Sequence, residues 1–122
     1  NNLDTIFLVS PNTKSSRLKK IAKASSGFLY LVAVFGTTGV QAKINKYTID
    51  AIKNTKKIVD VKLPVGIGFG ISTPADVEKY VSAGVDAVIV GSAILKIIEN
   101  TPLPKLQNEI REYIKKLKRR TK

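Results

Sequence analysis

One stretch of the sequence decides the fold: Pro64-Val65-Gly66-Ile67-Gly68-Phe69-Gly70-Ile71-Ser72-Thr73-Pro74. Its first half is apolar and typical of a buried strand, and its second half carries the signals of a helix start. Thr73 can cap the helix, Pro74 suits the first helical position, and Asp76 supplies an acid at the third. The stretch therefore predicts a strand that passes through a glycine-rich turn directly into a helix.

A second stretch of the same kind is Val88-Ile89-Val90-Gly91-Ser92-Ala93-Ile94, again an apolar strand, a glycine, a hydroxyl residue as the expected cap, and a helix. The free N–H groups and positive dipole end of a helix attract anions, most often phosphate. Two such turns in series bind phosphate in many (β/α) barrels. We therefore expect a phosphate site between Gly70 and the Gly91-Ser92 pair.

The glycines of the first stretch leave two other interpretations open. Gly66, Gly68 and Gly70 spell G-x-G-x-G, whereas dinucleotide sites use G-x-G-x-x-G, and no acidic residue ends a following strand to hold a ribose. Alternatively, the missing Cβ atoms let strand and helix pack closely with no ligand. The second Gly-Ser turn favours phosphate over both.

The composition excludes several kinds of cross-link and of catalytic or metal-binding group, because the 122 residues contain no Cys, His or Met. There is no disulfide framework, no thiolate, and neither the commonest general base nor the commonest metal ligand. We therefore expect no metal and no cofactor. No apolar run approaches the about 20 residues of a membrane span and no signal peptide opens the chain, so we expect a cytoplasmic protein without a membrane partner. Since the chain starts at Asn1 without Met, we expect a fragment or a processed form.

The net charge of +12 raises the question of nucleic-acid binding. Most lysines fall on the polar faces of separate predicted helices, and the one dense cluster, residues 115–120, lies in a last helical turn where cations favour the dipole. No aromatic stacking platform accompanies it. We interpret the charge as a solvated lysine-rich surface and expect no nucleic-acid partner.

Four apolar runs predict strands at residues 6–10, 28–33, 65–69 and 87–90. They are continuous rather than alternating, which favours a parallel sheet covered by helices. Helices are predicted between and after them: one capped by Ser15 or Ser16 and ended by Gly27, one from about Tyr47, one from Pro74 to Gly84, and one over residues 93–100. A final helix carries the apolar stripe Leu106, Ile110, Tyr113, Ile114 and Leu117.

The predicted strands start at residues 6, 28, 65 and 87, so they are 22, 37 and 22 residues apart. A step of 22 residues suits one strand and one helix. The longer middle step places extra residues in a loop at 36–46, and long loops in such folds are often lids. The chain is thus predicted to be a single α/β unit over residues 1–122, four (βα) units plus one added helix.

Several motifs, taken in order, resemble the C-terminal part of the tryptophan synthase α subunit family. The first two are Ile6-Phe7-Leu8-Val9-Ser10-Pro11-Asn12-Thr13 and Gly27-Phe28-Leu29-Tyr30-Leu31-Val32, followed by Gly36-Thr37-Thr38-Gly39. The two glycine turns described above complete the set, so the resemblance covers essentially the whole chain. It implies the C-terminal half of a TIM barrel, its strands five to eight.

The resemblance also implies an activity, the cleavage of indole-3-glycerol phosphate to indole and glyceraldehyde 3-phosphate in tryptophan biosynthesis. That reaction needs an acid and a base, which in the family are carboxylates of the N-terminal half of the barrel. The acids of this chain look like surface or turn charges rather than replacements. They are Asp76, Glu78, Asp86, Glu99, Glu109 and Glu112. We therefore expect this stretch to bind substrate and to hold no catalytic residue.

Seven residues match substrate-binding positions of the family. Tyr30 matches a tyrosine beside the indole, although a buried tyrosine is also a common core residue. Thr38 and Gly39 match the mobile loop that closes over the substrate, and Gly39 also matches a phosphate contact. The turns after the last two strands contribute Phe69, Gly70, Gly91 and Ser92, the last three through backbone N–H groups and Ser92 also through its hydroxyl.

The resemblance implies three kinds of partner: a small phosphorylated substrate, the tryptophan synthase β subunit, and whatever completes the barrel. Four parallel strands leave two edges and one apolar face open, with Phe7, Leu29, Leu31, Ile67 and Ile89 among the strand residues from which that face is drawn. We expect the missing N-terminal half or a second copy of the chain to cover them. A non-catalytic half-barrel module and another phosphosugar-binding barrel enzyme are the alternative functions.

Overall fold

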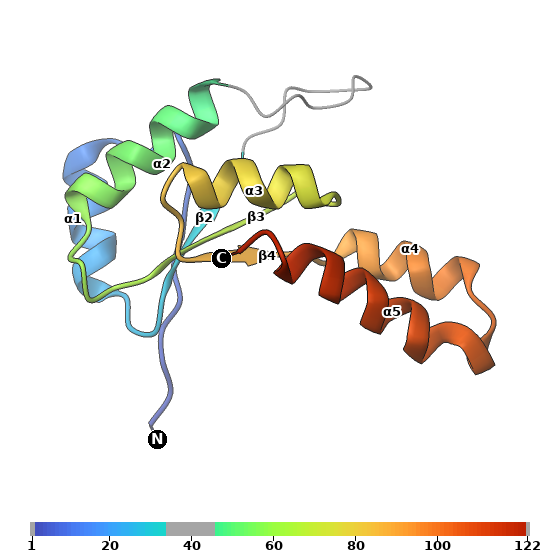
Figure 1. The fold of residues 1–122 in the computed structure, drawn as a ribbon. Coiled ribbons are helices and arrows are strands. Elements are labelled where there is room, and N and C mark those ends of the chain that lie inside the picture. Colours follow the sequence, from blue (N-terminus) through green and yellow to red (C-terminus); the bar gives the residue numbers. More distant parts are fainter. Residues whose placement is uncertain (1, 34–45, 122) are drawn as a thin grey trace.

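The computed structural model describes residues 2–33 and 46–121, in which strands and helices alternate (Figure 1). The elements, in chain order, are β1 (Leu8–Val9), α1 (Ser15–Ala24), β2 (Leu29–Val32), α2 (Lys46–Ile58), β3 (Val65–Gly68), α3 (Pro74–Ser82), β4 (Ala87–Ile89), α4 (Ser92–Asn100) and α5 (Leu103–Lys118). This order confirms the predicted α/β class, with four βα units and one added helix. The predicted loop at 36–46 falls almost wholly outside the described residues.

The four strands form one parallel sheet in the order β1-β2-β3-β4. Each strand therefore pairs with the strand that precedes or follows it in the sequence, as consecutive strands usually do. The register places Val9 beside Leu31, Leu31 beside Ile67, and Ile67 beside Val88. Side chains of residues that are paired in this way point to the same face of the sheet.

The described helices cover one face of the sheet, and the hydrophobic core lies between these helices and that face (Figure 1). Leu29, Leu31, Val65 and Ile67 from the two central strands are fully buried there. Helix side chains close the core from outside, chiefly Leu18 of α1, Ile52 of α2, Val77 and Tyr80 of α3, and Leu117 of α5. Of the predicted apolar stripe on α5, Leu117 is buried and Tyr113 packs against the core, whereas Ile114 is 41% exposed.

No helix of the described residues covers the opposite face of the sheet, and the residues on it differ in part from those expected. Leu29, Leu31 and Ile67 were candidates for this face, but the register places all three on the helix side. The open face instead carries Leu8, which is 63% exposed, and Tyr30, which is paired with it. Ile89 lies there as predicted, beside Gly68. The alternation of side chains along each strand decides the face, and a continuous apolar run conceals that alternation.

The N-cap residue is predicted correctly for one helix and wrongly for two. At α3, Thr73 is the N-cap and forms the predicted capping box with Asp76, while Pro74 takes the first helical position. At α1 the cap is Lys14, so Ser15 is the first helical residue rather than a cap. At α4 the cap is Gly91, and Ser92 begins the helix. A hydroxyl residue next to a helix start predicts the start well, but not the exact position of the cap.

The ends of α1 and α3 also differ from each other. Gly84, with φ of 104°, directly follows the cap residue Ala83, so it ends α3 as predicted. Gly27 also has a positive φ, 76°, but the cap of α1 is Ser25 in an extended conformation. The prediction that Gly27 ends α1 is therefore wrong, since it lies two residues beyond the cap. A Cβ on Gly27 would come within 3.0 Å of Asp4, so close packing and backbone conformation both favour glycine there.

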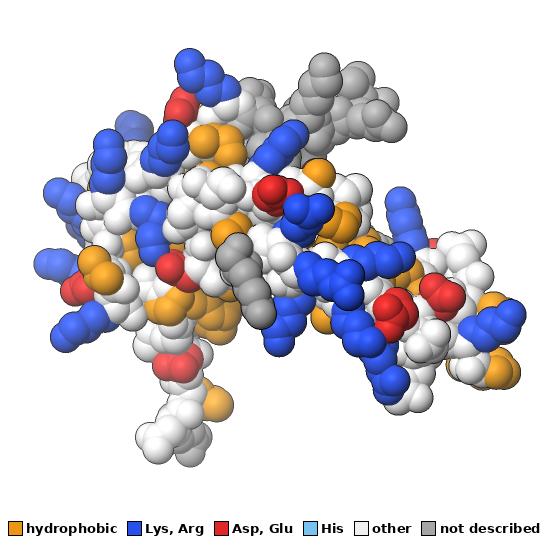
Figure 2. Space-filling view, viewed as in Figure 1, with side chains coloured by type: hydrophobic (Ala, Val, Ile, Leu, Met, Phe, Trp, Pro, Cys, Tyr) orange, Lys and Arg blue, Asp and Glu red, His pale blue; other side chains and the backbone are white. Residues whose placement is uncertain are grey.

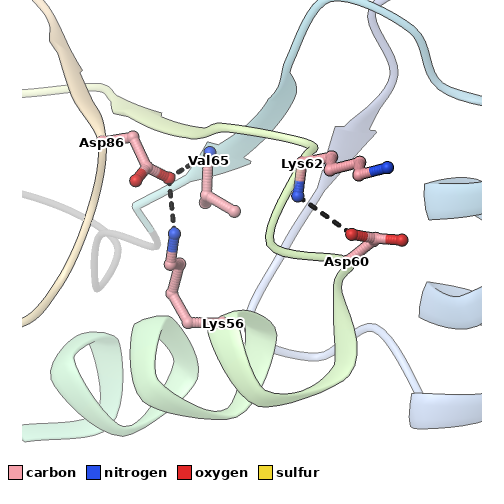
Figure 3. Close-up of polar contacts among 5 residues, drawn as sticks. All are labelled: Lys56, Asp60, Lys62, Val65 and Asp86. Atoms are coloured by element: carbon pink, nitrogen blue, oxygen red, sulfur yellow. Dashed lines mark hydrogen bonds and ion pairs between the residues drawn. The ribbon is translucent and has the colours of Figure 1, made fainter.

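Basic side chains are spread over the surface, as Figure 2 shows for one face of the molecule. Ion pairs within the described residues involve only three of them: Lys56 with Asp86, Lys115 with Glu112, and Arg120 with Glu78. The first of these ties three elements together (Figure 3). Asp86, just before β4, accepts hydrogen bonds from Lys56 of α2 at 2.6 Å and from the backbone N–H of Val65 in β3 at 2.7 Å.

These contacts also lower the pKa of Asp86. Burial by itself would raise the pKa, but the hydrogen bonds from Lys56 and Val65 and the charge of Lys56 outweigh it. A carboxylate whose pKa is lower in the folded than in the unfolded state stabilises the fold at pH values above its unfolded pKa, about 3.9. That contribution is lost as the pH falls through this value toward the folded pKa.

We expect Asp86→Asn to lower the free energy of unfolding at pH 7 by about 1 kcal/mol, because the ion pair is partly exposed and screened. The difference from the unmodified chain should shrink below about pH 4, where the native carboxylate is itself protonated. Urea unfolding at pH 7 and pH 3, at one protein concentration, measures both. The control is Glu112→Gln, which removes an exposed pair within one helix and should change nothing. Equal effects of the two variants would contradict the argument.

Candidate functional site

A cavity of about 520 Å³ opens where β3 and β4 end and α3 and α4 begin. It is lined by residues of both glycine turns and of β2, namely Tyr30, Phe69, Gly70, Ile71, Ile89, Gly91 and Ser92. Five of the seven residues selected from the sequence are in this lining. The other two, Thr38 and Gly39, lie outside the described residues. The structure therefore brings together, at one end of the sheet, residues that are up to 62 positions apart in the chain.

The turn after β3 has an unusual backbone conformation. Phe69 and Gly70 have φ values of 96° and 68°, so two consecutive residues are in the left-handed region. Gly70 adopts this conformation freely, whereas Phe69 is strained there by its Cβ. The turn also leaves the Phe69 side chain 62% exposed at the cavity. Such strain persists only where the surrounding structure holds it.

The turn after β4 supplies the other side of the cavity. Gly91 caps α4 with no side-chain hydrogen bond, and Ser92 is the first helical residue. Within the described residues, the N–H groups of Gly70, Gly91 and Ser92 donate to no protein atom, and neither does the Ser92 hydroxyl. Three unpaired N–H donors and a hydroxyl at one cavity are suited to a phosphate or another small anion.

Tyr30 reaches the cavity from β2 by lying across a glycine of β3. A Cβ on Gly68 would stand 1.9 Å from the Tyr30 hydroxyl oxygen, so no other residue fits beneath the ring. Phe28 lies over Gly66 in the same way, 3.2 Å from where its Cβ would be, and the two rings are 6.5 Å apart. The alternate glycines of β3 therefore make room for aromatic side chains of the neighbouring strand. The predicted close approach is confirmed for these two glycines, but the approaching group is an aromatic ring rather than a ligand or a helix.

No carboxylate of the described residues is in the lining of this cavity, and the acids occupy caps, ion pairs or the surface, as the sequence predicted. Asp76 completes the cap of α3, Glu78 pairs with Arg120, and Asp86 and Glu112 each pair with a lysine. Glu99 and Glu109 are exposed on α4 and α5. Within residues 2–33 and 46–121, no three acidic side chains are close enough to hold a metal ion. No helix in that part of the chain is long and apolar enough to cross a membrane.

Other cavities of similar size are lined by fewer groups suited to binding a ligand. One of about 610 Å³ lies between α1, α2 and the residues before β2 and β3, with three lysines, Asp60 and apolar side chains around it. The Asp60 carboxylate is already bonded to the backbone N–H of Lys62 at 2.9 Å (Figure 3). Two of the lysines, Lys19 and Lys23, are on α1, and Lys62 lies just before β3. The cavity at the glycine turns is therefore the candidate site.

Two residues of the apolar wall of the site, Ile71 and Ile89, were not among the predicted binding residues. Ile71 is 3% exposed and follows the first glycine turn, and Ile89 ends β4. Both stand next to residues that were selected, so position gave a signal for them. The direction of the Ile71 side chain could not be foreseen, because the left-handed turn at Phe69 and Gly70 breaks the alternation of the strand, whereas Ile89 was expected on the open face of the sheet.

Comparison with known proteins supports the family resemblance. The sequence model of the tryptophan synthase alpha chain family matches residues 1–122. The tryptophan synthase alpha chain of Methanothermobacter thermautotrophicus is 48% identical over 97 residues, which cover 80% of this chain and 35% of that one. The chain from Thermococcus kodakarensis is 39% identical over 112 residues, covering 90% and 44%.

The fold is similar to solved structures from Pyrococcus furiosus. The tryptophan synthase α subunit superimposes with a TM-score of 0.80 at 33% identity, over 94% of this chain and 44% of the subunit. A chain of the α2β2 complex from the same organism gives 0.79 at 31% identity. The chain thus spans less than half the length of these relatives, whose fold is a TIM barrel. With a parallel βα sheet that superimposes on part of that barrel and a family match over its whole length, this chain belongs to the tryptophan synthase alpha chain family.

Proposed function

We propose that this chain is the substrate-binding, C-terminal half of a tryptophan synthase α-type lyase. The reaction is the cleavage of indole-3-glycerol phosphate to indole and glyceraldehyde 3-phosphate in tryptophan biosynthesis. The observation that carries the proposal is the cavity itself, whose lining combines three residues with unbonded N–H groups and several apolar and aromatic side chains. The N–H groups suit a phosphate, and the apolar and aromatic side chains suit a flat apolar ring. Indole-3-glycerol phosphate contains both groups.

Each part of the lining has its own task in this proposal. Gly70, Gly91 and Ser92 hold the phosphate through backbone N–H groups, and the Ser92 hydroxyl adds a fourth donor. Tyr30 and Phe69 pack against the indole. The contact of Thr38 and Gly39 with substrate rests on the family resemblance alone, because they lie outside the described residues.

The chemical step belongs to the complete barrel. Breaking the carbon–carbon bond requires an acid to protonate the indole ring and a carboxylate to take a hydroxyl proton. No carboxylate lines the cavity within the described residues, so both groups must come from elsewhere. We propose that residues 1–122 form one unit, that an N-terminal half supplies the acid and the base, and that this chain contains no catalytic residue. Cytoplasmic location stays a prediction from the sequence.

Partners follow from the same proposal. The chain resembles the α component of the P. furiosus α2β2 complex, so we propose that the completed barrel binds a tryptophan synthase β subunit. The open face of the sheet and the edges at β1 and β4 are proposed to be covered by the N-terminal half or, in its absence, by a second copy of the chain. The open face also favours the second candidate function, a half-barrel module that associates without catalysis.

The phosphate end is tested by Ser92→Asp. A carboxylate at the first position of α4 favours the helix dipole, so the fold should be kept, but its charge repels a phosphate dianion. We expect inorganic phosphate to bind at least about tenfold more weakly, measured by NMR titration of the chain. Ser92→Ala keeps the N–H and removes only the hydroxyl, so its loss should be smaller. Unchanged phosphate affinity in Ser92→Asp would place the phosphate elsewhere.

A further inference from the structure

The turn that borders the phosphate end of the cavity is held by a residue far away in the sequence. Tyr113, on α5, donates its hydroxyl hydrogen to the backbone oxygen of Ser72 at 2.9 Å, across 41 positions of the chain. Two further contacts bring α5 to this place: Leu117 is buried in the core, and Arg120 pairs with Glu78 of α3 at 3.3 Å. In Figure 1 the C-terminal part of α5 returns toward the sheet from the end of the helical hairpin.

Most polar groups of the turn form hydrogen bonds with the first residues of α3. The N–H groups of Ser72 and Thr73 both donate to the Asp76 carboxylate, at 3.2 and 2.9 Å, and the Thr73 hydroxyl accepts from the N–H of Asp76. For the described residues, the Tyr113 hydroxyl is the one polar contact that reaches residues 70–73 from outside the β3–α3 segment. The Gly70 N–H stays unbonded, in a residue that lines the cavity.

The turn needs an external support because its backbone is strained. Phe69 has a φ of 96°, a conformation that costs a non-glycine residue about 1–3 kcal/mol and persists only when the surroundings impose it. Two anchors follow directly in the sequence: the Ile71 side chain is 3% exposed, and the Ser72 oxygen is bonded to Tyr113. Burial, and then the nearby Asp76 charge, raise the pKa of Tyr113, so its hydroxyl keeps its proton and remains a donor at neutral pH.

We propose that Tyr113 is a positioning residue for the candidate phosphate site: its bond to Ser72 holds the Phe69-Gly70 turn in the left-handed conformation that leaves the Gly70 N–H free for the ligand. The inference rests on the proposed function of the cavity. Tyr113 touches no ligand in this account and acts only through the backbone. The resemblance to the family pointed to the two turns, whereas this third contribution comes from the added helix.

The test is Tyr113→Phe, which keeps the ring and removes only the hydrogen-bond donor. With inorganic phosphate as the probe and the 122-residue chain as the protein, we expect the dissociation constant to rise about threefold to tenfold, the factor that corresponds to one hydrogen bond. The Gly70 amide resonance should shift in the ligand-free variant. The urea midpoint should stay within the range of the controls.

Two controls separate positioning from general packing. Tyr80→Phe removes a hydroxyl from a tyrosine that is 4% exposed on α3 and has no hydrogen-bond partner within the described residues. Arg120→Ala breaks the other polar contact between α5 and α3 without touching the turn. Both should leave the phosphate affinity and the Gly70 resonance unchanged. If either variant weakens phosphate binding as much as Tyr113→Phe does, the positioning role is wrong and α5 acts through packing alone.

The remaining outcomes distinguish this inference from the proposed function. If phosphate binds, Ser92→Asp abolishes binding and Tyr113→Phe binds as well as the unmodified chain, the site stands and the role of Tyr113 is overturned. If the unmodified chain binds no phosphate, or if Ser92→Asp has no effect, the site itself is wrong and the inference falls with it. Weaker phosphate binding in both Ser92→Asp and Tyr113→Phe, with unchanged binding in the two control variants, supports both the phosphate site and the role of Tyr113.

Discussion

The purified 122-residue chain is expected to release indole from indole-3-glycerol phosphate at least about a thousandfold more slowly than a whole tryptophan synthase α subunit. The physical reason is that general acid–base catalysis contributes roughly 10²–10⁴-fold for each positioned group, and the cavity holds neither an acid nor a base within the described residues. The proposed binding of substrate by the glycine turns and Tyr30 would lower the barrier little, because it acts on the ground state and the transition state alike. Indole release measured at saturating substrate checks this.

The matched experiment restores the missing groups. Adding the N-terminal half of a relative such as the P. furiosus α subunit should raise the rate, because the two parts together supply the binding end and the acid–base pair. Ser92→Asp in the same mixture should raise the Michaelis constant, since it acts on the phosphate end. Turnover by the chain alone, near that of a whole subunit, would contradict the proposed division of the barrel.

The second large effect concerns association. We expect the isolated chain not to persist as a folded monomer, because among residues 2–33 and 46–121 no strand pairs with the outer edges of β1 and β4 and no helix covers one face of the sheet. An exposed edge pairs with any strand that it meets, and an apolar patch above a few hundred Å² seldom stays in contact with water. Two-fold symmetry makes a dimer the commonest solution. Sedimentation equilibrium at micromolar concentration should show a species of at least twice 13.3 kDa.

A pair of surface variants locates the interface. Leu8→Glu places a charge on the open face at the edge strand, where Leu8 is 63% exposed, and should raise the dissociation constant at least about tenfold. Val61→Glu places the same charge between α2 and β3, where Val61 is 94% exposed, and should have no effect. A compact 13.3 kDa species whose cooperative melting does not depend on protein concentration would show that the chain covers its own edges.

The local features of this fold could be predicted from the sequence because their causes are local. The strands lie within the apolar runs, the capping box of α3 follows from Thr73, Pro74 and Asp76, and Gly84 ends that helix. The two glycine turns identified the end of the sheet where the cavity lies. Each of these features depends on residues fewer than about five positions apart, over which periodicity and capping preferences are reliable.

Features that depend on strand register, or on contacts between residues distant in the sequence, could be established only from the tertiary structure. The face on which Leu29, Leu31 and Ile67 lie follows from the pairing of strands, and a run that is apolar throughout cannot reveal it. The Tyr30 ring over Gly68 joins β2 to β3, and the Tyr113 hydroxyl meets Ser72 across 41 positions. The packing of whole elements determines which of these contacts form. The free energy of one contact is small compared with that of burying a sheet against its helices. The sequence by itself determined the elements and the end of the sheet where the candidate site lies, and the tertiary structure decided which side chains meet there, because their contacts depend on strand register and on residues distant in the sequence.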